Sequence, residues 1–150
     1  MNVQRCVVVF ELRMRGYDVT ARPSWGSEDF MRIPENWLGA FEYSPDDIKK
    51  CNGNTTPEMI KSTEKFIRSF GEGARVIIWF DWDTEKTGLN YGHALNAFTE
   101  NGIIRIIDPN NANPNAENVL NCAKLGTVKI MRVDNLNLTN MVKRCAMNRE

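Results

Sequence analysis

The side chains best suited to chemistry lie on the two arms of an expected β-hairpin. Asn101-Gly102 separates two apolar-rich runs, and an Asn-Gly pair in this position is a strong signal for a tight hairpin turn. Counting outward from this turn pairs His93 with Asn110. Because side chains alternate faces along a strand, Asp108 shares that face and becomes the diagonal neighbour of His93. An imidazole beside a carboxylate supplies the base and the orienting group of a nucleophilic triad.

A structural interpretation of the same residues stays open. His93 is the only histidine, and a lone histidine in a strand is commonly half-buried without any chemical role. Asp108-Pro109 is also a common way to end a strand. A base and its orienting group without a nucleophile are only part of a catalytic site.

The nucleophile of such a site would be a cysteine thiolate at the start of a helix. A helix N-terminus and a nearby imidazolium both stabilise the thiolate. Of the four cysteines, at positions 6, 51, 122 and 145, Cys6 lies one turn into an expected N-terminal helix. It also falls on the apolar stripe of that helix, where it would pack as a small hydrophobic residue. Backbone N–H groups at the helix start, with Gln4 or another amide, are candidates to hold an oxyanion.

Hydrophobic periodicity and turn signals define the elements that must position these residues. They predict helices over 2–15, 55–70, 117–123 and 136–147, strands over 17–22, 74–82 and 127–133, and the hairpin over 92–108. The order of helix, strand, long loop, helix, mostly antiparallel sheet and helix is typical of the α+β class. Residues 24–54 show no sustained period, and the aromatic residues Trp25, Trp37 and Phe41 there either line a cleft or cover an edge of the core.

Composition excludes several classes of function. The 150 residues include 19 basic and 19 acidic side chains, so the formal net charge of +0 argues against nucleic acid or an anionic membrane as partner. No apolar run approaches the roughly 20 residues of a membrane-spanning helix. Asp81, Asp83 and Glu85 alternate, but they lack the glycine and the distal glutamate of a calcium-binding loop. We also expect the four cysteines to be free thiols, and we expect no bound metal and no cofactor.

Four stretches resemble a known family. The sequence reads NVQRCVV from Asn2 and ELRMRGYDVTARP from Glu11. This is similar to the opening of the papain fold toxin domains of bacterial polymorphic toxins and phage minor head proteins, with its Asn-Cys-x-x-Cys start and Arg-Arg-Gly-Tyr-Asp-Val-Thr-Ala helix end. GHALNA from Gly92 and IDPN from Ile107 resemble the family's Gly-His strand and its Asp-Pro-Gln-like end.

The resemblance implies a papain-like fold, with the N-terminal helix packed on a mostly antiparallel sheet and further helices flanking it. It also implies a Cys–His–Asp site, in which His93 matches the base and Asp108 the orienting residue. Asn110 stands where the family often has glutamine. The implied reaction is acyl transfer on a carboxamide, either deamidation of a glutamine side chain in a target protein or cleavage of a peptide bond.

The chain departs from the family at the expected nucleophile. The family's first cysteine falls on Val3, and its second falls on Cys6. Three explanations are open. Val3 is an engineered substitution that silences a toxic enzyme, or this chain is a naturally inactive relative. In the third explanation Cys6 is the true nucleophile. The corresponding functions are a silenced glutamine deamidase, a catalytically dead papain-like binding module, or a cysteine protease that uses Cys6. A purely structural appendage of a phage or secreted protein also stays open.

The resemblance implies the biological setting as well. We expect one papain-like domain over residues 1–150, forming the C-terminal part of a longer secreted or virion protein of bacterial or phage origin. The expected partners are a protein substrate in a target cell and an immunity protein, with neither nucleic acid nor membrane bound and this fragment soluble.

Overall fold

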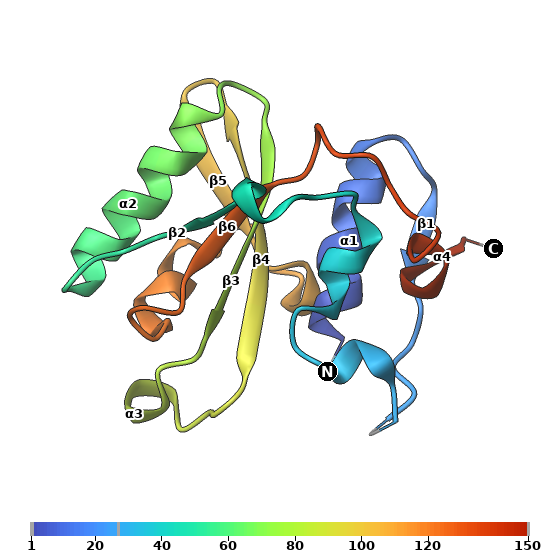
Figure 1. The fold of residues 1–150 in the computed structure, drawn as a ribbon, viewed down its shortest axis with the longest axis horizontal. Coiled ribbons are helices and arrows are strands. Elements are labelled where there is room, and N and C mark those ends of the chain that lie inside the picture. The colour runs from blue at the N-terminus through green and yellow to red at the C-terminus, as the bar shows by residue number, and fades with distance from the viewer. Residues whose placement is uncertain (1, 27, 150) are drawn as a thin grey trace.

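An antiparallel sheet forms the centre of the computed structural model, which describes residues 2–26 and 28–149. Its five strands run in the order β2-β6-β3-β4-β5, each antiparallel to its neighbours (Figure 1). Their bounds are Ile48–Lys50 for β2, Arg75–Asp81 for β3, Gly92–Glu100 for β4, Ile103–Ile107 for β5 and Lys129–Arg132 for β6. The predicted α+β class with a mostly antiparallel sheet is confirmed.

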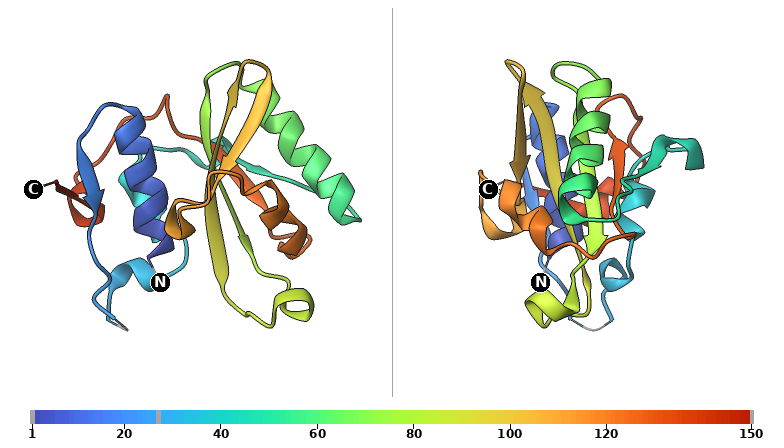
Figure 2. Two further views of the ribbon diagram at one scale, coloured as in Figure 1. Left: turned by 180° about the vertical axis from the view of Figure 1, so that it is seen from behind. Right: turned by 90° about the vertical axis from the view of Figure 1, so that its left-hand side faces the viewer.

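Two long helices cover opposite faces of this sheet, as Figures 1 and 2 show. Helix α1 (Val3–Met14) packs with Ile77 and Trp79 of β3, and α2 (Thr56–Ser69) packs with the alternate β3 side chains such as Ile78. Strand β3 is therefore buried on both faces, as its unbroken apolar run predicts. Both helices lie within one residue of their predicted bounds at each end.

Shorter elements connect this framework. They are the helices α3 (Thr84–Thr87) and α4 (Val142–Cys145), the strands β1 (Val19–Ala21) and β7 (Ala146–Asn148), and the 3₁₀ helices Phe30–Arg32, Asn36–Ala40, Pro45–Asp47, Pro109–Asn111 and Glu117–Cys122. Strands β1 and β7 pair antiparallel in a separate two-stranded sheet. Within the described residues, no helix combines the length and the apolar character needed to cross a membrane.

The β4–β5 hairpin has the predicted turn and register. Asn101 and Gly102 have φ values of 52° and 77°, the two positive values that a type I′ turn requires. Pairing runs from Glu100 opposite Ile103 to Asn96 opposite Ile107. Pairing of β4 with β3 continues the alternation of faces from Phe98 through His93.

The predicted pairing of His93 with Asn110 is wrong, because the ladder ends at Ile107. The Asp108 side chain instead accepts a hydrogen bond from the backbone N–H of Asn111 and caps a 3₁₀ helix. Pro109 has no N–H and a fixed φ, so it cannot continue a paired strand. The turn after Ile107 carries Asn110 toward α1, where its Oδ1 lies 3.3 Å from the backbone nitrogen of Asn2.

The predicted closing helix over 136–147 is also wrong. Only Val142–Cys145 is helical, and β7 follows it directly. The backbone of residues 137–139 bonds to residues 40–42 instead, with the Thr139 N–H donating to the Ala40 carbonyl and the Glu42 N–H to the Asn137 carbonyl. These tertiary bonds, with the low helix propensity of Asn and Thr, prevail over the apolar spacing that suggested a helix.

A buried carboxylate ties α1 to the sheet. Glu11 is 1% exposed and accepts hydrogen bonds from Arg15 at 2.8 Å and from Arg75 of β3 at 2.6 Å. Arg15 in turn donates to the carbonyls of Val133 and Leu136. Glu11 thus joins the helix, the central strand and the segment after β6 in one network.

We predict that Glu11→Gln lowers the free energy of unfolding by roughly 2–3 kcal/mol, because it leaves two guanidinium groups without their carboxylate. Denaturant unfolding at pH 7 measures the change. Glu100→Gln is the matched control, since Glu100 is exposed at the end of β4, and it should change stability by less than about 0.5 kcal/mol. Equal losses in the two variants would contradict the role given to Glu11.

Candidate active site

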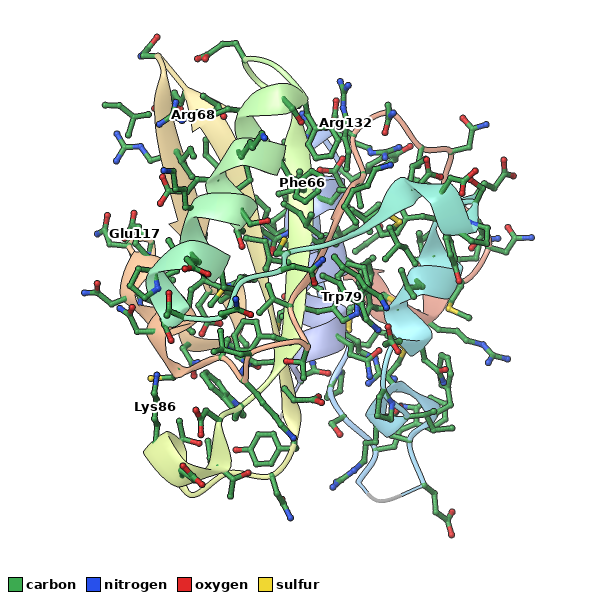
Figure 3. All side chains as sticks on the ribbon, turned by 60° about the vertical axis from the view of Figure 1, so that its left-hand side comes forward. Phe66, Arg68, Trp79, Lys86, Glu117 and Arg132 are labelled. Carbon is green, nitrogen blue, oxygen red and sulfur yellow. The ribbon has the colours of Figure 1, made fainter. Side chains whose placement is uncertain are left out.

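A cavity of about 530 Å³ lies between the start of α1, the segment 24–37 and the strands β3, β4 and β6. Val3, in the first turn of α1, and His93, near the start of β4, both line it. Trp79 contributes to the wall from β3, and Figure 3 shows it between the sheet and the segment 30–40. The structure therefore places the first turn of α1 and the residue His93 around one space.

His93 and Asp108 form a direct, buried contact. Nε2 of His93 lies 2.8 Å from Oδ2 of Asp108, and the two side chains are 2% and 3% exposed. The amide of Asn111 also donates to Oδ2 at 2.8 Å. A carboxylate accepts hydrogen bonds, so the neutral imidazole carries its proton on Nε2 and has a lone pair on Nδ1.

The other imidazole nitrogen has no partner among the described residues. Nδ1 of His93 is buried and makes no hydrogen bond to a side chain or backbone group of these residues. Buried polar atoms are normally hydrogen-bonded, so an unpaired ring nitrogen in a residue that lines a cavity needs an explanation. With its proton on Nε2, the neutral imidazole keeps a basic lone pair on Nδ1, which is the protonation state that a general base requires.

Two aromatic residues of β3 and its extension hold the imidazole ring in place. Trp82 stacks on His93 with ring centroids 4.8 Å apart and an interplanar angle of 24°. Phe80 meets the same ring edge-on at 6.0 Å. The pair of His93 and Asp108 is therefore shielded from water on this side, which strengthens the interaction between them.

A buried ion pair joins α1 to the cavity wall that contains Asp29. Arg5 forms a two-pronged contact with Asp29, in which Nη2 lies 2.8 Å from Oδ1, and both residues are 1% exposed. Asp29 also accepts the backbone N–H groups of Trp25 and Met31, each at 3.0 Å. The hydrogen bond from Arg5 holds the pKa of Asp29 well below its usual range, so the pair stays charged at neutral pH.

Gln4 fastens the same wall with its amide group. Its Nε2 donates to the carbonyls of Met31 and Ile33, and its Oε1 accepts the backbone N–H of Trp37 at 2.8 Å. The Gln4 side chain is therefore not free to hold an oxyanion, contrary to one sequence-based expectation. The backbone N–H groups of the first turn of α1 have no intrahelical partner and remain as candidates.

Cys6 lies beside the cavity but is not among the residues that line it. Its Sγ is 3.9 Å from Oδ1 of Asn110. Burial, and then the negative charge of Asp108, raise the pKa of the Cys6 thiol, and Arg13 offsets only part of this. The thiol is thus held in its neutral form, which is the weaker nucleophile.

The other cysteines and the acidic loop after β3 lie outside the cavity lining. Burial raises the pKa of the Cys51 thiol and raises that of Cys145 to about 11, and all four cysteines are free. Asp83 caps the N-terminus of α3 through its side chain. In the part of the chain that the structure describes, no group of three or more His, Cys, Asp or Glu side chains could hold a metal ion.

Sequence reasoning placed some of these residues and missed others. It brought His93 and Asp108 together, and it put Val3 at the helix start that lines the cavity. It missed Trp82, although a tryptophan two residues beyond Phe80 has the alternation of one strand face. The sequence contains no pattern that predicts the contact between Arg5 and Asp29. Asp29 lies in an irregular segment, where neighbouring residues do not indicate which distant side chain it will meet.

Comparison with known protein families gives one match. The model of the family described as papain fold toxin 1, glutamine deamidase, matches residues 1–112. Comparison with curated proteins gives no significant match, and neither does comparison with solved structures. The matched region includes α1, the cavity-lining residues between Asp29 and Trp37, the β4–β5 hairpin with His93, and Asp108 directly after it. The chain belongs to the papain fold toxin 1 family of glutamine-deamidase-type toxins.

Proposed function

We propose that this domain has the site of a protein-glutamine deamidase, with the nucleophile position occupied by Val3. His93 is the base, and Asp108 orients it. The observation that carries this proposal is the buried, unpaired Nδ1 of His93, in a residue that shares its cavity with Val3 at the start of α1. A cysteine at position 3 would have both the helix N-terminus and the imidazole to stabilise its thiolate.

The chemistry of the active form follows from these positions. The thiol at position 3 gives its proton to Nδ1 of His93, and the sulfur attacks the carboxamide carbon of a substrate glutamine. The resulting oxyanion is held by first-turn backbone N–H groups. Nδ1 returns the proton to the amide nitrogen, which leaves as ammonia. Water, deprotonated by the same nitrogen, then hydrolyses the thioester to release glutamate and the free thiol.

In the chain as it stands, the alkyl side chain of Val3 cannot perform the first step. The proposal therefore makes this chain a silenced form that keeps the cleft and can still bind its target. Cys6 is the alternative nucleophile, for deamidation or for proteolysis. Its position off the cavity and its raised pKa weigh against it. A binding module without chemistry is the second candidate function, and Val3 is the feature that favours it.

The proposal extends to partners and setting. The substrate is a protein of a target cell, and an immunity protein would protect the producing cell by covering the cleft. Delivery as part of a longer secreted or virion protein fits a toxin domain. No cofactor takes part in the proposed reaction, because the thiol, the imidazole and water account for every bond that is made or broken.

We predict that Val3→Cys turns over glutamine-containing proteins, whereas the chain with Val3 does not. Each deamidated glutamine adds about 1 Da, which intact mass spectrometry resolves after incubation with a protein mixture. Cleaved peptides in place of the mass gain would identify a protease. Activity already present with Val3 would assign the chemistry to Cys6, and inactivity of both chains would favour the binding module.

In the Val3→Cys background, we predict that His93→Gln lowers kcat by at least about 10³-fold. The glutamine amide can still donate to Asp108, but it has no basic nitrogen to replace Nδ1. The thermal midpoint should stay within a few degrees, measured by circular dichroism. Asp108→Ala should cost less activity than His93→Gln, since an orienting residue is commonly the less costly loss. Full activity in His93→Gln would exclude His93 as the base.

A further inference from the structure

Glu35, in the wall of the cavity, has an unusual backbone conformation. Its φ of 66° and ψ of 7° lie in the left-handed region, which glycine and asparagine occupy far more easily than glutamate. A residue held in this region is a local cost that the surrounding structure must offset, and such residues concentrate at functional sites. The side chain at this position therefore needs an explanation beyond loop geometry.

The Glu35 carboxylate bridges the loop to two strands of the sheet. Its Oε2 accepts the indole N–H of Trp79 at 2.8 Å and lies 3.3 Å from Nζ of Lys129. Trp79 is 6% exposed and needs an acceptor for its N–H, which Oε2 supplies alone. For Oε1 the described residues provide no partner. The carboxylate is thus held in a fixed direction with one oxygen unused.

The hydrogen bond to Trp79 and the ion pair with Lys129 do not explain why a glutamate is held in a left-handed conformation at position 35. The side chains of Glu35 and Lys129 are 42% and 32% exposed, and an ion pair this exposed contributes little to stability. An uncharged acceptor in a relaxed conformation would serve the indole equally well. What these two contacts leave unexplained is a carboxylate oxygen without a partner beside the ammonium group of Lys129. Glu35 and Lys129 both line the cavity that His93 lines.

The sheet register gives the backbone spacing between Lys129 and Ala94, the residue of β4 that follows His93. Ala94, the residue after His93, lies opposite Trp79, and Trp79 lies opposite Lys129. Lys129 is therefore two strands away from the β4 backbone, about 10 Å at the usual spacing between strands. An extended peptide advances about 3.3 Å per residue, so this span corresponds to about three residues of a bound substrate.

We propose that Glu35 and Lys129 form a second substrate subsite, which binds an amide group about three residues from the target glutamine. Oε1 accepts the amide N–H, and Nζ of Lys129 donates to the amide carbonyl oxygen. The pair fits an uncharged amide because its opposite charges offset each other while presenting one acceptor and one donor. The amide is either a peptide unit of the substrate main chain or the side chain of asparagine or glutamine. The inference rests on the proposed deamidase function and names a determinant of its substrate.

The kinetic test uses Val3→Cys and compares substrates that do and do not reach the subsite. The long substrate is an acetylated, amidated heptapeptide of alanine with one central glutamine, and the short one is acetylglutamine amide. We expect Glu35→Ala and Lys129→Met each to raise KM about tenfold for the heptapeptide with little change in kcat. The ratio of kcat/KM between long and short substrates should fall by the same factor.

Two altered substrates distinguish a main-chain amide from a side-chain amide, and one variant outside the cavity serves as a control. A heptapeptide with asparagine at both ends shows a larger effect only if a side-chain carboxamide is bound, whereas N-methylation of one main-chain amide removes the effect if a peptide unit is bound. Lys61→Met, on the exposed face of α2, should change neither substrate. Equal losses on the long and short substrates would make Glu35 a purely structural residue and overturn the proposal.

A binding measurement separates this inference from the proposed chemistry. The dissociation constant of the heptapeptide for the chain with Val3 should rise about tenfold in Glu35→Ala, measured by calorimetry. If that rise occurs while Val3→Cys is inactive on both substrates, the subsite stands and the deamidase proposal fails. If Val3→Cys is active while Glu35→Ala and Lys129→Met leave KM and the dissociation constant unchanged, the subsite fails and the deamidase proposal stands.

Discussion

The arrangement of the cavity depends on the buried ion pair between Arg5 and Asp29. Removing two charges from water is costly, and the interaction repays this only when the remaining donors and acceptors are also satisfied. Here the carboxylate receives two guanidinium nitrogens and two backbone N–H groups, and the remaining guanidinium nitrogen, Nε, donates to the carbonyl of Arg144. Loss of either partner would leave an uncompensated charge in the wall of the cavity.

This ion pair also helps to explain how the first turn of α1 positions two walls of the cavity. Val3, Gln4 and Arg5 are consecutive, so their side chains leave α1 in different directions. The side chains of Gln4 and Arg5 bond to residues 29, 33 and 37 of the facing wall, and Val3 lines the same cavity as His93. The position proposed for the nucleophile is thereby fixed relative to the facing wall of the cavity by bonds from its own neighbours. Such fixed geometry is what converts a nearby reactive group into an effective one.

The sequence predicted those parts of the site that depend on local rules. The Asn101-Gly102 turn fixed the hairpin register, and the register brought Asp108 to His93. It failed one step later at Asn110, because Pro109 ends the ladder. Glu35 and Asp29 lie in a segment without periodicity, so their positions follow from tertiary contacts with α1, β3 and β6. The same reason accounts for the error over 136–147, where contacts with residues 40–42 replace helical bonds.

The central claim is that position 3, and not Cys6, is the place where a thiol becomes reactive. The most direct measurement is the rate of alkylation by iodoacetamide at pH 6, with each cysteine followed by peptide mapping. The account predicts slow alkylation of every thiol in the chain with Val3, and alkylation of the new thiol in Val3→Cys faster by about 100-fold or more, because only a thiolate paired with an imidazolium is abundant at that pH. Fast alkylation of Cys6 in the chain with Val3 would contradict the account.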